Sequence, residues 1–211
     1  MLTISIIAQK GGSGKTTVAR CLAVSFELSG RSAAIIDLDP QASATLWGDR
    51  RGEDNPPEVI STALPLLDKT LAAAKASVDV VLIDTPPKSS EAALAAAKAA
   101  DLVLIPCRPQ IDDIETLPAT RQLLELVGKG DRSFVVLNSV PSYRPRTEEA
   151  MESIKSHPKG SFDVCSVTFG QRAAFGDSSV VGRTPSEFDP DGKASEECEK
   201  LHKFVKKIVS M

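Results

Sequence analysis

The sequence contains few of the residues that mark metal-binding, disulfide-bonded or membrane proteins. It has four cysteines, which are widely separated and form no C-x-x-C pair, and two histidines. A zinc site is therefore not expected, and we interpret the cysteines as reduced, mostly buried thiols. No apolar run approaches the roughly 20 residues of a membrane-spanning helix. Because no secretory leader is recognisable at the start either, we expect a cytoplasmic protein.

An excess of one charge is also lacking. The formal net charge is −3, so the chain has no overall attraction to nucleic acid or to an anionic membrane. Any such contact has to come from a local basic patch. The length of 211 residues suits one compact domain. Because no repeat or low-complexity linker divides the chain, we predict a single domain over residues 1–211.

The main feature that is present is an alternation of two patterns. Runs rich in valine and isoleucine alternate with helical patterns, and runs that are apolar almost throughout are typical of strands buried on both faces. We predict an α/β fold, a doubly wound and mostly parallel sheet with helices on both faces. The predicted strands are 2–8, 32–38, 58–61, 79–84, 101–106, 132–138 and 162–167. The predicted helices are 15–29, 65–76, 89–99, 112–127, 147–156 and 193–209, with a long loop at 176–192.

A glycine loop follows the first predicted strand and precedes the first predicted helix. It nearly fits the phosphate-binding pattern G-x-x-x-x-G-K-[ST], although Gln9 takes the place of the first glycine. Glycines let backbone N–H groups turn toward phosphate oxygens, and the helix N-terminus adds a positive field. We predict that Lys15 contacts the β- and γ-phosphates, that Thr16 binds Mg²⁺ and that Thr17 contacts the α-phosphate. The other predicted nucleotide-binding residues of this loop are Gly11, Gly12, Ser13 and Gly14.

Aspartates stand at the carboxyl ends of two further predicted strands. Asp37 and Asp39 follow the second strand, and Asp84 ends a later one. Ligands bind at this edge of a doubly wound sheet, and Mg²⁺ takes oxygen ligands while it keeps several waters. We therefore predict Asp37 and Asp84 as metal residues together with Thr16, and Asp39 as the residue that orients an attacking water. Any one aspartate taken singly could equally be a turn or a helix cap.

Three segments resemble those of a known family. Residues 10–17 (KGGSGKTT) are similar to the deviant Walker A motif K-G-G-x-G-K-T-[ST]. Residues 37–41 (DLDPQ) resemble the Walker A′ motif, and residues 80–87 resemble the Walker B segment. On these motifs the chain is identified as a member of the ParA/MinD family of P-loop ATPases, and the resemblance spans nearly its whole length.

The resemblance implies ATP and Mg²⁺ as cofactors and a role for the additional lysine, Lys10. In that family this lysine reaches across a two-fold interface to the phosphates bound by the partner subunit, where it neutralises charge during phosphoryl transfer. The resemblance thus implies a sandwich homodimer favoured by ATP, with Lys10, Lys15 and Asp39 as catalytic residues. The alternative for Lys10 is an ordinary solvated loop lysine.

Later segments resemble the family's features around the base and the dimer face. Residues 106–109, followed by Asp112, are similar to an I-P-x-x-P segment that lies close to the nucleotide, so Pro109 is a predicted nucleotide-binding residue. Asn138 stands where relatives such as MinD use an Asn against adenine, although it could equally form a local turn. Residues 84–87 resemble the start of a switch that senses the γ-phosphate.

The last part of the sequence bears on what an ATP-bound dimer would hold. Residues 201–209 have apolar side chains at helical spacing with lysines opposite, so they either pack on their own domain or lie on an anionic membrane. Residues 168–172 and 182–185 resemble small ParA and ParF partition ATPases. This implies slow, partner-stimulated hydrolysis, with non-specific duplex DNA and a centromere-binding protein of the ParB or ParG kind as partners. The ATP-bound form would then associate with the nucleoid.

Non-specific DNA binding requires basic side chains that contact phosphates. The phosphate loop begins close to the first residue, so we expect neither an N-terminal DNA-reading extension nor sequence-specific recognition. Each basic residue taken singly could be an ordinary solvated side chain. The predicted contact residues are Arg146, Arg172, Arg183 and Lys203, with Arg144, Lys193, Lys200 and Lys206 as further candidates.

Two other functions remain open. One is a membrane-cycling positioning ATPase like MinD, which shares the ATP machinery. The other is a metabolic or metal-cluster carrier ATPase of the same superfamily, against which the lack of a paired C-x-x-C weighs.

Overall fold

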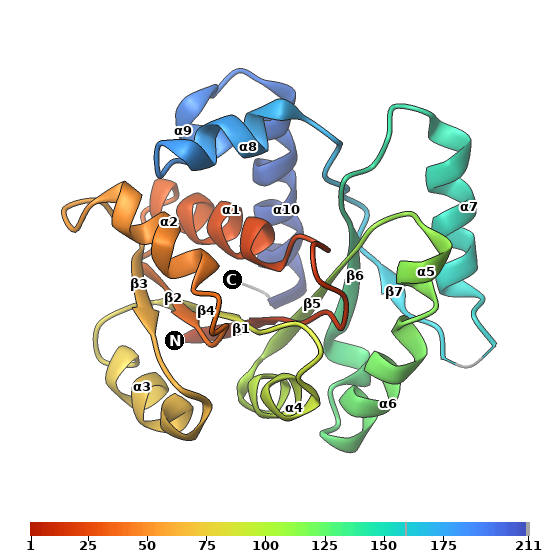
Figure 1. Ribbon diagram of the computed structural model, residues 1–211, viewed down its shortest axis with the longest axis horizontal. Helices are drawn as coiled ribbons and strands as arrows, with labels where there is room; N and C mark the ends of the chain where they lie inside the picture. The colour runs from red at the N-terminus through yellow and green to blue at the C-terminus, as the bar shows by residue number, and fades with distance from the viewer. Residues whose placement is uncertain (159, 210–211) are drawn as a thin grey trace.

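The computed structural model describes residues 1–158 and 160–209, apart from the side chain of Arg144. Its centre is a seven-stranded sheet in the order β3-β2-β4-β1-β5-β6-β7, in which each pair of neighbouring strands is parallel (Figure 1). The strands are β1 (Leu2–Ile6), β2 (Ala33–Asp37), β3 (Glu58–Ser61), β4 (Val80–Asp84), β5 (Leu102–Cys107), β6 (Ser133–Leu137) and β7 (Asp163–Val164).

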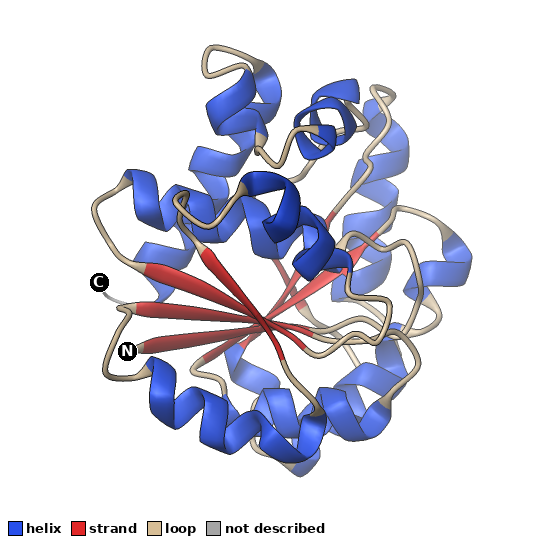
Figure 2. Ribbon diagram, turned by 60° about the vertical axis from the view of Figure 1, so that its left-hand side comes forward, coloured by secondary structure: helices blue, strands red, loops and turns tan. Residues whose placement is uncertain are grey.

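Helices cover both faces of this sheet (Figure 2). They are α1 (Lys15–Leu28), α2 (Ser43–Arg51), α3 (Leu67–Ala74), α4 (Ser90–Ala99), α5 (Ile111–Ile114), α6 (Leu117–Leu126), α7 (Arg144–Lys155), α8 (Ala173–Val180), α9 (Pro185–Phe188) and α10 (Lys193–Val209). Helices α1 and α10 pack on one face, and α3, α4, α6 and α7 pack on the other. The predicted α/β fold with a parallel sheet is confirmed.

The central strands of this parallel sheet are buried on both faces, because the helices that connect them cover it on either side. Strands β1, β2, β4 and β5 are buried at every position, as their near-continuous apolar sequences require. All parallel strands have their carboxyl ends at one edge, so the loops after β1, β2, β4, β5 and β6 meet there. This edge carries the residues singled out in the sequence.

The predicted helix at 112–127 is divided in the structure. It forms the short helix α5 and the longer α6, and Pro118 lies in the first turn of α6. Proline is tolerated in a first turn, where its missing N–H is not needed, but it disfavours a continuous helix through that position. The break turns α5 toward the phosphate loop.

The predicted long loop at 176–192 is wrong over part of its length. Helix α8 extends to Val180, and α9 follows within the predicted loop. The start of α9 is stabilised by a capping box, in which the side chains of Thr184 and Glu187 satisfy backbone N–H groups of the first turn. Pro185 at the first helical position also favours a helix there.

Helix α2 was not predicted, and it lies against the turn between α8 and α9. Trp47 of α2 is fully buried, and its indole Nε1–H donates to the carbonyl oxygen of Arg183 at 3.2 Å. Gly182 has φ +67°, and a Cβ at this position would stand 2.4 Å from the backbone nitrogen of Arg51. The glycine therefore allows a backbone-to-backbone contact that any other residue would prevent.

The C-terminal helix α10 uses its apolar stripe inside the domain. Cys198, Leu201 and Val205 are buried in the cluster that α1 forms with the sheet, and Phe204 and Ile208 pack against the same cluster. Figure 1 shows α10 alongside α1. Residues 201–209 therefore pack on their own domain, which is the first of the two expectations for this segment. In the described part of the chain, no helix is long and apolar enough to cross a bilayer.

Candidate functional site

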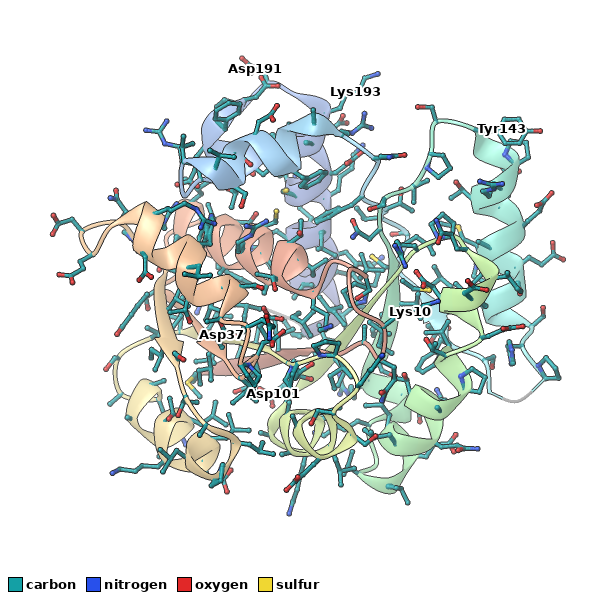
Figure 3. The ribbon with its side chains drawn as sticks, in the orientation of Figure 1. Lys10, Asp37, Asp101, Tyr143, Asp191 and Lys193 are labelled. Atoms are coloured by element: carbon teal, nitrogen blue, oxygen red, sulfur yellow. The ribbon has the colours of Figure 1, made fainter. Side chains whose placement is uncertain are left out.

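Three strand ends converge beside the phosphate loop. Asp84, the last residue of β4, pairs in register with Asp37 at the end of β2 and with Ile6 at the end of β1. The phosphate loop leaves directly after β1 and leads into α1 at Lys15. Figure 3 shows Asp37 near α2, whereas Lys10 points to the side of α5. The parallel sheet thus brings the predicted phosphate and metal residues together.

The tight curvature of the loop depends on Gly14. Its φ is +100°, and a Cβ on this residue would lie 1.9 Å from Nδ2 of Asn138. That amide nitrogen donates to the carbonyl oxygen of Ser13 at 2.7 Å. Asn138 therefore fastens the end of β6 to the phosphate loop, and only glycine leaves room for this contact.

An open cleft of about 550 Å³ lies over this loop, a size within the usual range for small-molecule sites. Most of the predicted nucleotide residues line it, and so does Asp39. Ser13, Lys10, Pro109, Asp37 and Asp84 do not. The lining residues are Gly11, Gly12, Gly14, Lys15, Thr16, Thr17, Arg20, Asp39, Ser43, Leu46, Arg50, Pro87, Asn138, Ser139 and Ser179.

Lys15 supplies a buried positive charge at the base of the cleft. Only 7% of the residue is exposed, and in the described part of the chain no carboxylate lies within the 4.0 Å of an ion pair. Burial lowers the pKa of Lys15, an effect that the negative charges of Asp84 and Asp39 partly offset. A buried ammonium without an adjacent anion is suited to an anionic ligand.

Asp84 and Thr16 have the donor set of a magnesium site. The Thr16 hydroxyl donates to Oδ2 of Asp84 at 2.6 Å, while Oδ1 is buried and has no hydrogen-bond partner in the described residues. Burial raises the pKa of Asp84 to about 7, although the hydrogen bond from Thr16 opposes this shift. A nearby cation would favour the ionised form and satisfy the free oxygen. The residues present therefore fit Mg²⁺.

Asp37 holds the loop that follows it. Its Oδ1 accepts from the backbone N–H of Asp39 at 3.0 Å, and its Oδ2 accepts from both the N–H and the hydroxyl of Thr45 at 2.9 Å. Asp37 thus ties the end of β2 to α2. Asp39 is half-buried and faces the cleft, where its Oδ1 accepts from the N–H of Gln41 at 2.9 Å.

Lys10 lies outside the cleft and is held by acids of α5. Its Nζ is 3.3 Å from Oδ1 of Asp113 and 3.8 Å from Oδ2 of Asp112. Asp113 is 2% exposed and also accepts two hydrogen bonds from the guanidinium of Arg108. Burial alone would raise the pKa of Asp113, but the hydrogen bonds and charges of Arg108 and Lys10 hold it below its usual value.

The sequence reading singled out Asp112 in this segment, whereas Asp113 makes the closer contacts. Helix α5 turns Asp113 inward, and Asp112 is the more exposed of the pair. Pro109 is buried in the turn before α5, away from the residues that line the cleft. The spacing in the sequence could not show which aspartate faces the phosphate loop, because the break between α5 and α6 decides this.

The predicted DNA-contacting residues differ in their surroundings. Arg172 is paired with Glu197 at 2.6 Å, and Lys203 is paired with Glu199 on the same helix. Arg146 and Arg183 are exposed and form no ion pair within the described residues. The side chain of Arg144 lies outside the described residues. Among the further candidates, Lys200 is paired with Glu196. Of the four predicted contact residues, Arg146 and Arg183 are therefore the ones without an ion pair in the described chain.

Arg20 and Arg50 were missed at the sequence level. Arg20 lies on α1, three residues after Thr17, and Arg50 comes from α2; both line the cleft. The helical spacing from Thr17 could have identified Arg20, because residues three apart share a helix face. Arg50 could not have been found in this way, since α2 itself was not predicted.

The fold, the glycine loop and the strand-end aspartates define a P-loop nucleotide-binding protein. The family model described as the CobQ/CobB/MinD/ParA nucleotide binding domain matches residues 4–167. The chain belongs to this family, which includes the ParA/MinD-type ATPases identified from the motifs.

Curated relatives include partition and positioning proteins. The chain is 34% identical over 118 residues to "Maintenance of carboxysome distribution protein A" of Gloeobacter kilaueensis, a match that covers 56% of this chain and 54% of that protein. It is 31% identical over 138 residues to "Protein ParA" of Rhizobium radiobacter, which covers 64% of this chain and 60% of that protein. The matches thus span little more than half of the length of these relatives.

Solved structures share the fold at low sequence identity. The ATP complex of a McdA variant from Cyanothece has a TM-score of 0.72 at 20% identity, covering 100% of this chain and 97% of that chain. MinD of Pyrococcus horikoshii, complexed with Mg-ADP, has a TM-score of 0.72 at 20% identity, covering 99% and 97%. Structures with this fold thus bind ATP and Mg-ADP.

Proposed function

We propose that this chain is a ParA-type partition ATPase that binds Mg·ATP in the cleft over the phosphate loop. ATP binding would bring two copies into a sandwich homodimer, which would hold non-specific duplex DNA at the nucleoid. A centromere-binding protein of the ParB or ParG kind would accelerate an otherwise slow hydrolysis. The similarity to ParA and carboxysome-positioning proteins supports the class of cargo-moving ATPases.

The observation that carries this proposal is the separation of the two loop lysines. Lys15 lines the cleft, whereas Lys10 lies outside it beside α5. We infer that a lysine in that position would not serve the nucleotide of its own chain. It is available to a nucleotide bound by a second copy, which is the role that the deviant Walker motif implies.

The residues of the cleft have the chemistry that ATP hydrolysis requires. Lys15 would contact the β- and γ-phosphates, and the backbone of residues 11–14 would surround them. Asp39 would orient the attacking water, and Lys10 of the second copy would neutralise charge in the transition state. Thr16 and Asp84, with Asp37 behind them, would hold Mg²⁺. When bound, the ion neutralises phosphate charge.

The described part of α10 does not support the membrane-cycling alternative, since its apolar stripe is buried against α1 and the sheet. Arg146 and Arg183 would supply the proposed DNA patch. Arg172 and Lys203 would first have to break their ion pairs with Glu197 and Glu199. Two such patches on a dimer would bind more tightly than one, which gives a physical reason for ATP-dependent DNA affinity.

The test is binding to random-sequence duplex DNA with ATP, ADP or no nucleotide across a salt series. We expect binding that requires ATP, weakens steeply with salt and disappears in Lys15→Ala. Asp39→Ala should still bind DNA with ATP while it no longer hydrolyses the nucleotide. Absence of DNA binding, with ATP-driven dimerisation intact, would refute the partition assignment. Normal hydrolysis by Asp39→Ala would refute the role of that residue.

A further inference from the structure

The cleft extends beyond the phosphate loop to a pair of arginines. Arg20 of α1 is half-buried, and its Nη1 donates to the hydroxyl of Ser179 in α8 at 2.5 Å. Its Nη2 lies 3.5 Å from the hydroxyl oxygen of Thr17. Arg50 of α2 approaches from the opposite side, where its Nε donates to the carbonyl oxygen of Ser179 at 3.1 Å. Two guanidinium groups from different helices therefore converge on Ser179 beside Thr17.

The charges along this cleft are unbalanced. Lys15, Arg20 and Arg50 line it, and Asp39 is the one carboxylate among its lining residues. Within the described chain no carboxylate is within ion-pair distance of Arg20 or Arg50. Burial lowers the pKa of Arg20, an effect that the nearby Cys21 and Asp84 partly offset and that the charge of Arg50 reinforces. A half-buried guanidinium in this setting is stabilised by an anion from outside the chain.

Arg51, the neighbour of Arg50, provides the contrast. Its guanidinium forms two hydrogen bonds to Glu187, at 2.6 and 3.0 Å, and one to the carbonyl oxygen of Gly182 at 3.0 Å. Arg20 and Arg51 both lie over the ring of Trp47, with the guanidinium carbon 5.7 and 5.2 Å from its centroid. Arg51, which lies outside the cleft, thus has a carboxylate partner, whereas Arg50, which lines the cleft, has none among the described residues.

Capping of α8 does not account for Arg20. Arginines near a helix C-terminus can satisfy its free carbonyl groups, and the single hydrogen bond of Arg50 to Ser179 fits that role. Arg20 instead contacts the Ser179 hydroxyl, and within the described residues only two of its five N–H donors have hydrogen-bond partners, Ser179 and Thr17. The other donors of Arg20 are free to meet a ligand in the cleft.

We propose that Arg20 is a further nucleotide-binding residue, whose guanidinium contacts the α-phosphate of the nucleotide beside Thr17, with Ser179 fixing its direction. This inference rests on the proposed function, because it presumes a nucleotide over the phosphate loop. Lys15 reaches the β- and γ-phosphates, so the α-phosphate is the anion nearest to Thr17 and hence to Arg20. A planar guanidinium is well suited to two parallel hydrogen bonds with phosphate oxygens.

The test measures the affinity of the full-length protein for ADP and for a non-hydrolysable ATP analogue, in the presence of Mg²⁺. Arg20→Met keeps the apolar stem over Trp47 and removes the charge, and Arg20→Lys keeps the charge without the planar fork. We expect Arg20→Met to weaken both nucleotides by the same factor, about tenfold to a hundredfold, because both contain the α-phosphate. Arg20→Lys should recover part of this loss.

A structural role would give a different result, and two further measurements separate the cases. Arg51→Met removes the other arginine over Trp47 and should leave ADP affinity within about twofold, since it has no contact with the cleft. The two diastereomers of ADPαS each replace one α-phosphate oxygen by sulfur. The wild-type protein should distinguish them, and Arg20→Met should distinguish them much less.

Each remaining outcome decides the matter. Equal losses in Arg20→Met and Arg51→Met, with unchanged discrimination between the diastereomers, would overturn the proposal and assign Arg20 to packing. ADP affinity of Arg20→Met within twofold of wild type would also overturn it, while leaving the proposed function intact if Lys15→Ala loses binding. A wild-type protein that binds neither ADP nor the ATP analogue would refute the proposed function itself. If Arg20→Met does not fold, Arg20→Lys takes its place. The comparison is then whether Arg20→Lys distinguishes the two ADPαS diastereomers less than the wild-type protein does.

Discussion

Lys10 and Lys15 belong to the same loop, yet their surroundings are opposite. Lys15 is 7% exposed and has no carboxylate at ion-pair distance in the described residues, whereas the side chain of Lys10 is 36% exposed and lies against Asp113 and Asp112. One charge is thus kept without a partner inside a cleft, and the other is neutralised within the chain. The loop thus leaves Lys15 unpaired at the proposed phosphate site, whereas Lys10 would have to leave an ion pair to reach a nucleotide of a second copy.

The strongest test of this comparison removes the unpaired charge. Lys15→Ala should weaken ATP and ADP binding by about a hundredfold or more, because a charge-assisted contact to the phosphates is lost inside a partly water-excluded cleft. Isothermal titration calorimetry would measure the affinity. Lys69→Ala, which changes an exposed lysine of α3 on the other face of the sheet, is the matched control and should bind normally. Retained binding in Lys15→Ala would show that the cleft is not the phosphate site.

Asp84, which accepts a hydrogen bond from Thr16 at the start of α1, gives a pH dependence. The pKa of Asp84 is raised to about 7 by burial, so folding favours its protonated form. The stabilisation is fully present below the unfolded pKa near 4 and is lost as the pH rises through about 7. In Mg²⁺-free urea unfolding, Asp84→Asn should remove this loss, which we expect to be on the order of 1–3 kcal/mol between pH 5 and pH 8. Parallel pH profiles for the two proteins would contradict the shift.

Lys10 should matter for assembly more than for binding. Lys10→Ala should bind ATP within about twofold of wild type, because its ammonium does not line the cleft, yet dimerise about tenfold more weakly. Both measurements belong in an Asp39→Ala background, so that ATP persists during analytical ultracentrifugation. Loss of ATP affinity in the monomer would instead place Lys10 on the nucleotide of its own chain.

The smallest expected effect comes from releasing Lys10 within its own chain. Asp113→Asn removes the closer of its two acids and should strengthen ATP-dependent dimerisation by about threefold, since Lys10 would no longer have to leave an ion pair. Asp112→Asn is the control: this acid is 76% exposed and 3.8 Å away, so its effect should be smaller. Weaker dimerisation in Asp113→Asn would mean that Asp113 itself is needed at the interface.

Features that depend on local sequence could be predicted. Strands such as residues 80–84 are apolar throughout and end in an aspartate, and this pattern alone located the edge where Asp37 and Asp84 meet. The glycine loop was also readable, because few structures other than a phosphate-binding turn require that spacing of glycines before a lysine. These elements could be predicted because the local sequence pattern and the overall fold favour the same structure.

Features that depend on tertiary contacts could not be predicted from the sequence. Helix α2 is short and its sequence is mostly polar, so its formation depends on the burial of Trp47 against α8 and α9. The inward position of Asp113 depends on a helix break that spacing did not reveal. Arg50 lines the cleft only because α2 places it there. For α2 and for Arg50, contacts distant in sequence therefore decide the role.

The contact at Gly182 has a mechanical consequence. The turn between α8 and α9 meets the backbone of α2 with no side chain between them, so the two backbones are in direct contact. Helix α2 is also tied through Thr45 to Asp37, whose other carboxylate oxygen accepts from the N–H of Asp39. Two direct contacts through α2 therefore join the loop at Asp39 to the surface turn that carries Arg183. Any side chain at position 182 would push this turn away from α2 and separate the two regions.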